Sequence, residues 1–198
     1  MKCWLAWFGP FSSRHRVCGP EWILYGLILL CFIALYFHLA AILIQTTNLD
    51  RRASDQKANM ELAALARGDV VPMRTNAVSN GLWPWVSTLV WDEDEERFFE
   101  RGKWLNVIIS ATGLLLAGLV AGFFLPFLSA CNFVFLTGLG ALLPRAVYFQ
   151  PEPLYYLFFL GACVLGARLF FRNTLGTHAL FGACVGLAYL AKPGVEPL

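Results

Sequence analysis

Charged side chains are scarce in this sequence. Asp, Glu, Lys and Arg supply 14% of its 198 residues, and 58% of the residues are hydrophobic. A soluble domain normally carries about 25% charged residues. A water-soluble fold of this length could not cover so much apolar surface, and the apolar residues gather in long runs. The sequence therefore predicts an integral membrane protein.

The patterns of several common binding sites are also missing. The formal net charge is only +2, and no basic stripe with interleaved aromatics stands outside the apolar runs, so no nucleic-acid partner is expected. None of the six cysteines lies in the long polar segment 45–103, and no CxxC or Cys/His spacing suggests zinc. P-loop and dinucleotide fingerprints are absent as well. We expect no structural disulfide and no zinc site.

The apolar runs predict an all-α, polytopic transmembrane bundle of about five spans. Short linkers between the later spans require neighbouring helices to pack antiparallel, as hairpins. The chain then divides into a cytoplasmic head 1–21, a first span 22–44, an outer loop 45–103 with interfacial helices, further spans within 104–190, and an outer tail 191–198. The expected spans are Trp22–Ile44, Trp104–Leu125, Phe127–Tyr148, Leu154–Phe171 and His178–Leu190.

Basic residues near the span ends predict the orientation. Lys2, Arg14 and Arg16 precede the first span, and Arg168 and Arg172 close the fourth. Basic flanks favour the cytoplasm, and a five-span chain with its N-terminus inside places both groups there. We expect a multi-pass membrane protein, in a bacterial inner membrane rather than the endoplasmic reticulum. The polar segment 45–103 then lies on the outer side.

That outer loop contains three helical signals. Ser54 is a good N-cap for a helix over Asp55–Arg67, with Gly68 just beyond its C-terminus. Its apolar face, Ala58, Leu62, Leu65 and Ala66, is typical of a helix lying at the membrane interface. A second, tryptophan-rich element is expected over Leu82–Trp91, and a charged helix over Asp92–Arg101 leads into the second span.

Several short motifs follow one another in a distinctive order. They are Ser54-Asp55-Gln56 after the first span, Asn-Gly-Leu-Trp-Pro-Trp at Asn80 to Trp85, Phe-Phe-Glu-Arg-Gly-Lys at Phe98 to Lys103, Tyr-Phe-Gln-Pro-Glu-Pro-Leu at Tyr148 to Leu154, and Gly-Leu-Ala-Tyr-Leu-Ala-Lys-Pro at Gly186 to Pro193. Together they resemble the N-terminal part of the GT-C membrane glycosyltransferases, the superfamily of protein O-mannosyltransferases and bacterial aminoarabinose transferases. The resemblance covers nearly the whole chain from Trp22 onward. Members of that superfamily have more spans, so the resemblance implies that this sequence is a front segment.

The resemblance implies a sugar donor carried on a polyprenyl phosphate, and a catalytic or metal-linked carboxylate at the start of the first outer loop. Asp55 matches that position, and Glu152 lies on the same side in the predicted topology. A transferase needs a carboxylate to deprotonate the acceptor and cations or a metal to hold the leaving phosphate. Arg145 and Lys192 end spans on that side and could meet the phosphate. No cofactor is required by the sequence, although a divalent metal is possible.

Each of these residues also has a structural interpretation. Asp55 could be a helix-start charge, Glu152 a polar turn residue, and Arg145 and Lys192 cations that reach the interface from span ends. The chain could then be a non-catalytic scaffold or assembly subunit, or a small transport component. His38 alone brings an ionisable side chain to mid-span, which disfavours transport. The sugar and the acceptor, protein or lipid, stay open.

Overall fold

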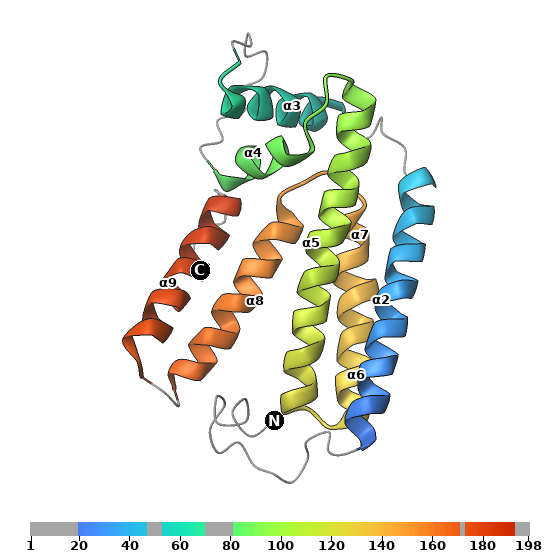
Figure 1. The fold of residues 1–198 in the computed structure, drawn as a ribbon, viewed down its shortest axis with the longest axis vertical. Helices are drawn as coiled ribbons and strands as arrows, with labels where there is room; N and C mark the ends of the chain where they lie inside the picture. The colour runs from blue at the N-terminus through green and yellow to red at the C-terminus, as the bar shows by residue number, and fades with distance from the viewer. Residues whose placement is uncertain (1–19, 47–52, 70–80, 171–172, 193–198) are drawn as a thin grey trace.

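The computed structural model describes residues 20–46, 53–69, 81–170 and 173–192, with side chains in α3 described from Asn59 onward (Figure 1). Within these ranges the chain is helical apart from short turns, and no strand occurs. The predicted all-α class is confirmed for this part of the chain. The head, 1–19, and the tail, 193–198, lie outside the described residues.

Four helices are long and apolar enough to cross a membrane, judged by length and composition. A fifth apolar helix, α9, has 17 residues and a length of ~26 Å at about 1.5 Å per residue, slightly less than a hydrocarbon core of about 30 Å. The integral membrane class therefore follows from the structure, while the predicted count of five spans stays a prediction. The helices are α2 (Pro20–Thr46), α5 (Glu95–Phe124), the continuous run α6 (Phe127–Phe135), η3 (Leu136–Leu142) and α7 (Leu143–Ala146), then α8 (Glu152–Leu169) and α9 (Leu175–Ala191).

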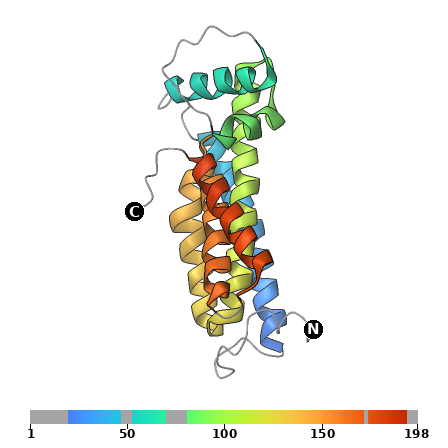
Figure 2. The same ribbon diagram turned by 90° about the vertical axis from the view of Figure 1, so that its left-hand side faces the viewer.

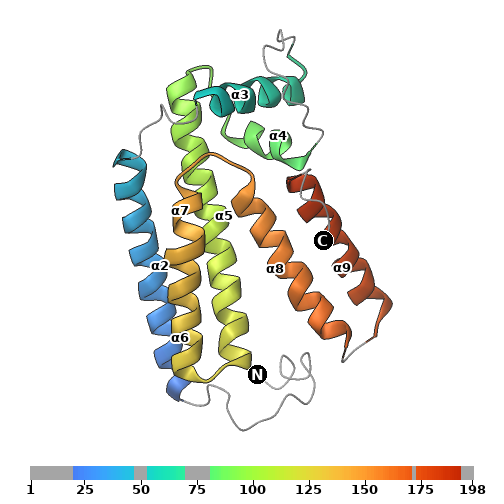
Figure 3. The same cartoon turned by 180° about the vertical axis from the view of Figure 1, so that it is seen from behind.

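Helix α5 is central. The α2 and α6–α7 helices pack on one side of it, α8 packs on the other, and α9 lies beyond α8 (Figures 1 and 3). Helix α2 buries one stripe at helical spacing: Tyr25, Leu29, Phe32, Tyr36, Ala40 and Ile44. Two tyrosines on this stripe bond to α5: the Tyr25 hydroxyl donates to the Gly118 carbonyl at 2.7 Å, and Tyr36 and Ser110 hydroxyls lie 2.8 Å apart. Polar groups thus join α2 to α5 inside the apolar bundle.

The third long helix contains a π-helical segment, η3, in its middle. Pro144 lies two residues after its end, and a proline within a helix removes one backbone donor and clashes with the preceding turn. The wider π turns before it relieve that conflict without ending the helix. Gly138, in the same segment, faces Phe32 so closely that a Cβ there would lie 2.7 Å from its Cε1 atom.

A small helical cap covers one end of the bundle. Helix α3 (Ala53–Arg67) lies across the span direction, and α4 (Leu82–Ser87) with the 3₁₀ turn η2 (Thr88–Val90) lies beneath it (Figures 1 and 2). Gly68 ends α3 with a positive φ of 91°, as the sequence predicts for a residue just past a helix C-terminus. Ser54 lies inside α3 and not at its N-cap, because the helix begins at Ala53.

Two details of the cap add to the sequence expectations. The protein-facing side of α3 includes Ala63, which is 0% exposed, whereas Leu65 of the predicted apolar face is 38% exposed. The reason is that α3 rests on protein through small side chains, which allow a close approach to the aromatic cluster below. The charged helix expected over Asp92–Arg101 is the first part of α5, which begins at Glu95. The Asp94 side chain caps it by accepting from the Glu96 amide at 3.0 Å, so this acidic run is a helix start.

The hairpin of α8 and α9 packs closely at the glycines of one helix. The Gly182-x-x-x-Gly186 spacing favours a close helix contact, yet neither glycine has another part of the described chain within 4 Å of a Cβ built there. The contact is made by the glycines of α8 instead. A Cβ on Gly161 would lie 3.2 Å from Cys184 Sγ, and one on Gly166 would lie 3.1 Å from Phe181.

Candidate functional site

Glu152 and Lys192 meet at the capped end of the bundle. Glu152 is the first residue of α8, and Lys192 is the C-cap of α9. Because α8 and α9 form an antiparallel hairpin, the start of one lies beside the end of the other (Figure 1). Lys192 Nζ donates to Glu152 Oε1 at 3.2 Å. Two of the four candidate side chains, separated by 40 residues in sequence, therefore form one ion pair.

The surroundings of this pair leave one carboxylate oxygen unused. The Glu152 side chain is 16% exposed and that of Lys192 is 38% exposed. Glu152 Oε2 is buried and has no hydrogen-bond partner among the described residues. A helix N-terminus favours the carboxylate and a helix C-terminus favours the ammonium, so each charge is stabilised by its own helix as well as by its partner. The pair thus combines a part-exposed ammonium, on Lys192, with a carboxylate whose Oε2 has no partner among the described residues.

Arg145 lies at the end of α7 and is exposed. Its carbonyl accepts a hydrogen bond from Gln150 Nε2 at 3.1 Å. No ion pair within the described ranges includes its guanidinium, so the structure does not bring Arg145 to the Glu152–Lys192 pair. Its predicted contact with a donor phosphate stays a prediction.

Asp55 belongs to α3, and its side chain lies outside the described part of the structure. Its position along the helix is informative, because it comes one turn before Asn59. Asn59 Nδ2 donates to the Phe149 carbonyl at 3.0 Å. The helix that carries Asp55 therefore contacts the short connection that leads into Glu152. The convergence of the two carboxylates on one cavity stays a prediction.

Sequence reasoning missed the polar side chains that hold this region together. Asn106 is fully buried in α5 and donates to the carbonyls of Tyr148 and Gln150, the latter at 2.9 Å. Lys103, one turn before it, is also buried. A signal was present, since an amide within an expected span usually bonds to a neighbouring helix. The burial of Lys103 was not expected, because the charged run before it is typical of a solvent-exposed segment.

Aromatic rings fill the space between the cap and the spans. Phe149 is the centre of this cluster: its ring centroid lies 5.2 Å from that of Trp83, 5.1 Å from that of Phe98 and 6.1 Å from that of Phe99. Trp83 is buried against protein in this cluster. Trp85, by contrast, is 63% exposed and free to meet lipid or water.

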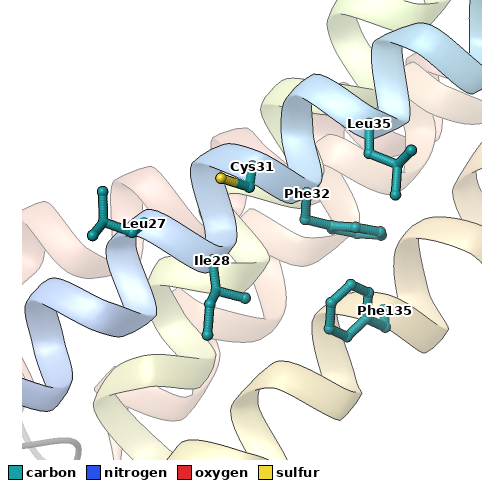
Figure 4. A pocket seen from close by; sticks show the side chains of 6 residues that line it. All are labelled: Leu27, Ile28, Cys31, Phe32, Leu35 and Phe135. Carbon is teal, nitrogen blue, oxygen red and sulfur yellow. The ribbon is translucent and has the colours of Figure 1, made fainter.

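The described residues offer no ready metal site, since nowhere among them do three His, Cys, Asp or Glu side chains gather closely enough to hold an ion. The possible divalent metal stays a prediction. A groove does occur on the outer face of α2 beside α6 (Figure 4). Its lining carries no charge, which suits a lipid chain and not a phosphate. The lining residues are Leu27, Ile28, Cys31, Phe32, Leu35 and Phe135.

Together, the helical bundle and its capped end define an integral membrane protein with an acid–base ion pair at one end of its apolar helices. No family model matches the chain, and comparisons with curated proteins and with solved structures find no similar protein.

Proposed function

We propose that this chain is a GT-C-type membrane glycosyltransferase or its N-terminal segment. It would transfer a sugar from a polyprenyl-phosphate donor to an acceptor on the non-cytoplasmic side. In this proposal α9 is the fifth span, the N-terminus is cytoplasmic, and the capped end with the Glu152–Lys192 pair faces the outside of a bacterial inner membrane. The donor is a lipid, so its phosphate lies at the depth where span ends such as those of α8 and α9 emerge.

The observation that carries this proposal is the Glu152–Lys192 contact of 3.2 Å. Lys192 is part-exposed, and an ammonium at a span end is suited to bind a phosphate oxygen arriving from the membrane side. Oε2 of Glu152 has no hydrogen-bond partner among the described residues and is suited to accept a proton. The carboxylate and the ammonium thus lie side by side at the end of the bundle.

The chemistry assigned to these groups is a displacement at the anomeric carbon. An acceptor hydroxyl or amine attacks this carbon while its proton passes to a carboxylate, either Asp55 or Glu152. The bond between the anomeric carbon and the phosphate oxygen breaks, and the leaving phosphate keeps the electron pair. Lys192 stabilises the charge that develops on that oxygen.

The same ion pair also favours a second candidate function, a non-catalytic scaffold. A lysine and a glutamate that neutralise each other at the end of a hairpin fasten α8 to α9 without any ligand. In that case removing the pair changes stability and assembly only. A transferase requires in addition that activity be lost in variants that still fold.

The test uses the gene's complete product, reconstituted in liposomes with a polyprenyl-phosphate sugar and assayed for release of the polyprenyl phosphate. Asp55→Asn and Glu152→Gln should each lower turnover, by ~10²-fold or more for the variant that removes the proton acceptor. Lys192→Ala should instead weaken donor binding. Leu65→Ala, on the exposed side of α3, is the matched control. Normal turnover in both carboxylate variants would reject the proposal, whereas loss of assembly without any transfer by the wild type would favour the scaffold.

A further inference from the structure

The connection between α7 and α8 is held by side-chain amides from two directions. Its three successive carbonyls, at Tyr148, Phe149 and Gln150, all accept hydrogen bonds from asparagine side chains. Asn106 of α5 takes the first and third, and Asn59 of α3 takes the middle one. We call residues 148–150 the strap. Alternate carbonyls of the strap therefore face opposite helices, one in the span bundle and one in the cap.

The amide orientation of Asn59 is fixed by its two partners. Trp83 Nε1 can only donate, and it bonds to Asn59 Oδ1 at 3.2 Å. Asn59 must therefore turn its Nδ2 toward the Phe149 carbonyl, which can only accept, at 3.0 Å. One side chain thus joins α3, α4 and the strap. If the Asn59 amide were flipped, its Oδ1 would face the Phe149 carbonyl oxygen, and two acceptors would meet.

The Phe149 side chain gives the strap little freedom to move. Its ring packs against Trp83 and Phe98, and a Cβ on Gly102 would lie 2.5 Å from its Cδ2 atom. Glu152 follows the strap, three residues after Phe149, and stands between two prolines. Pro151 has a φ of −73°, and proline rings restrict the backbone on both sides of the carboxylate. A displacement of the strap is therefore passed on to Glu152.

We propose that Asn59 is a positioning residue for Glu152. By binding the Phe149 carbonyl it makes the seating of the cap on the bundle a condition for the Glu152–Lys192 contact. Asn106 holds the other side of the strap, but it is buried within the bundle, so Asn59 is the member of the clamp that depends on the cap. That Glu152 performs chemistry rests on the proposed function; the placement of Glu152 by Asn59 does not.

The experiment detects the Glu152–Lys192 ion pair through the reactivity of the Lys192 amine, and it requires no sugar transfer. The purified protein in detergent is treated with a water-soluble amine-acylating reagent, and the acylation rate of Lys192 is followed by peptide mass spectrometry, with Lys2 as the internal reference. Pairing with Glu152 shields Nζ, so Glu152→Gln should raise the Lys192 rate several-fold and sets the upper value. Asn59→Asp keeps size and the bond to Trp83 but loses the donor to Phe149. It should raise the Lys192 rate toward that upper value.

Matched variants separate positioning from general loosening of the fold. Leu65→Ala, on the exposed side of the same helix, should label as the wild type does. Asn59→Ala, which adds no charge, serves if the aspartate variant does not accumulate, and it should shift the rate in the same direction. The double variant Asn59→Asp with Glu152→Gln should label no faster than Glu152→Gln alone, because Asn59 acts through Glu152.

Three results would overturn the proposal. These are a wild-type Lys192 rate in both Asn59 variants, an equal rise in Leu65→Ala, and a further rise in the double variant. Equal labelling of the wild type and Glu152→Gln would also overturn it, since the contact to be positioned would then not protect the amine. A failure of sugar transfer in liposomes would refute the proposed function and leave this result unchanged.

Discussion

The contact between Gly102 and Phe149 gives a stability prediction with a defined sign. A Cβ on Gly102 would lie 2.5, 2.6 and 2.6 Å from three atoms of the Phe149 ring. These distances are far below van der Waals contact, and the ring is also packed against Trp83 and Phe98, which limits its movement. Overpacking of this kind typically costs about 1–3 kcal/mol. Replacing a helical glycine by alanine gains up to ~1 kcal/mol in propensity, which partly offsets the clash.

Gly182→Ala isolates the clash from the propensity gain. Gly182 is also helical, and nothing in the described structure lies within 4 Å of a Cβ built there. Gly102→Ala should therefore be less stable than Gly182→Ala by about 1–3 kcal/mol. For a chain of this size that difference corresponds to a gap of about 2–12 °C in Tm, measured by thermal unfolding in detergent with tryptophan fluorescence. A Tm for Gly102→Ala equal to or above that of Gly182→Ala would refute the packing described for Phe149.

Three further predictions concern the spans and their ends. Tyr36→Phe should destabilise the fold by about 0.6–1.5 kcal/mol, because it breaks the buried hydrogen bond to Ser110. A double-mutant cycle with Ser110→Ala, measured by the same thermal unfolding, should show a coupling energy of that size. Additive effects of the two substitutions would contradict the bond. Asp94→Ala should cost about 1 kcal/mol by removing the N-cap of α5, while Asp94→Asn should retain most of the stability in the same assay; equal losses would argue against capping. Single cysteines at Glu93 and Thr174, labelled in intact cells with an impermeant maleimide, should react from outside at the first position only; the reverse pattern would invert the proposed orientation.

The positions of the apolar helices were predictable because their signal is local. A run of apolar residues long enough to cross a bilayer identifies itself without knowledge of its neighbours. The second span is expected from Trp104, whereas the helix that contains it begins at Glu95. Hydropathy marks where the apolar region begins, whereas the helix begins where Asp94 supplies a cap. The first boundary depends on hydropathy, and the second depends on helix capping.

The packing of the cap was less predictable because it depends on contacts between distant segments. Helical spacing on α3 identifies an apolar face but does not say whether lipid or protein covers it. The structure turns Ala63 inward and leaves Leu65 part-exposed, since protein underneath favours small side chains. Asn59 and Asn106 are ordinary residues in the sequence. Their roles appear only in the folded chain, because each bonds to a strap carbonyl that is distant in sequence. Asn59 is 90 residues from Phe149, and Asn106 is 42 residues from Tyr148.

The length of α9 explains why Lys192 needs a partner. If α9 crosses the membrane, its ~26 Å falls short of a hydrocarbon core of about 30 Å, so its end lies close to the apolar boundary. An ammonium there is costly alone and far less so beside a carboxylate. Glu152, fixed at the start of the neighbouring helix, supplies that carboxylate at 3.2 Å. A lipid phosphate arriving at the same depth carries the same charge and could take the place of Glu152 as the counter-ion. That exchange would free Glu152 to accept a proton as the phosphate becomes bound, so the contact that stabilises the resting hairpin and the proposed catalytic role have one physical cause.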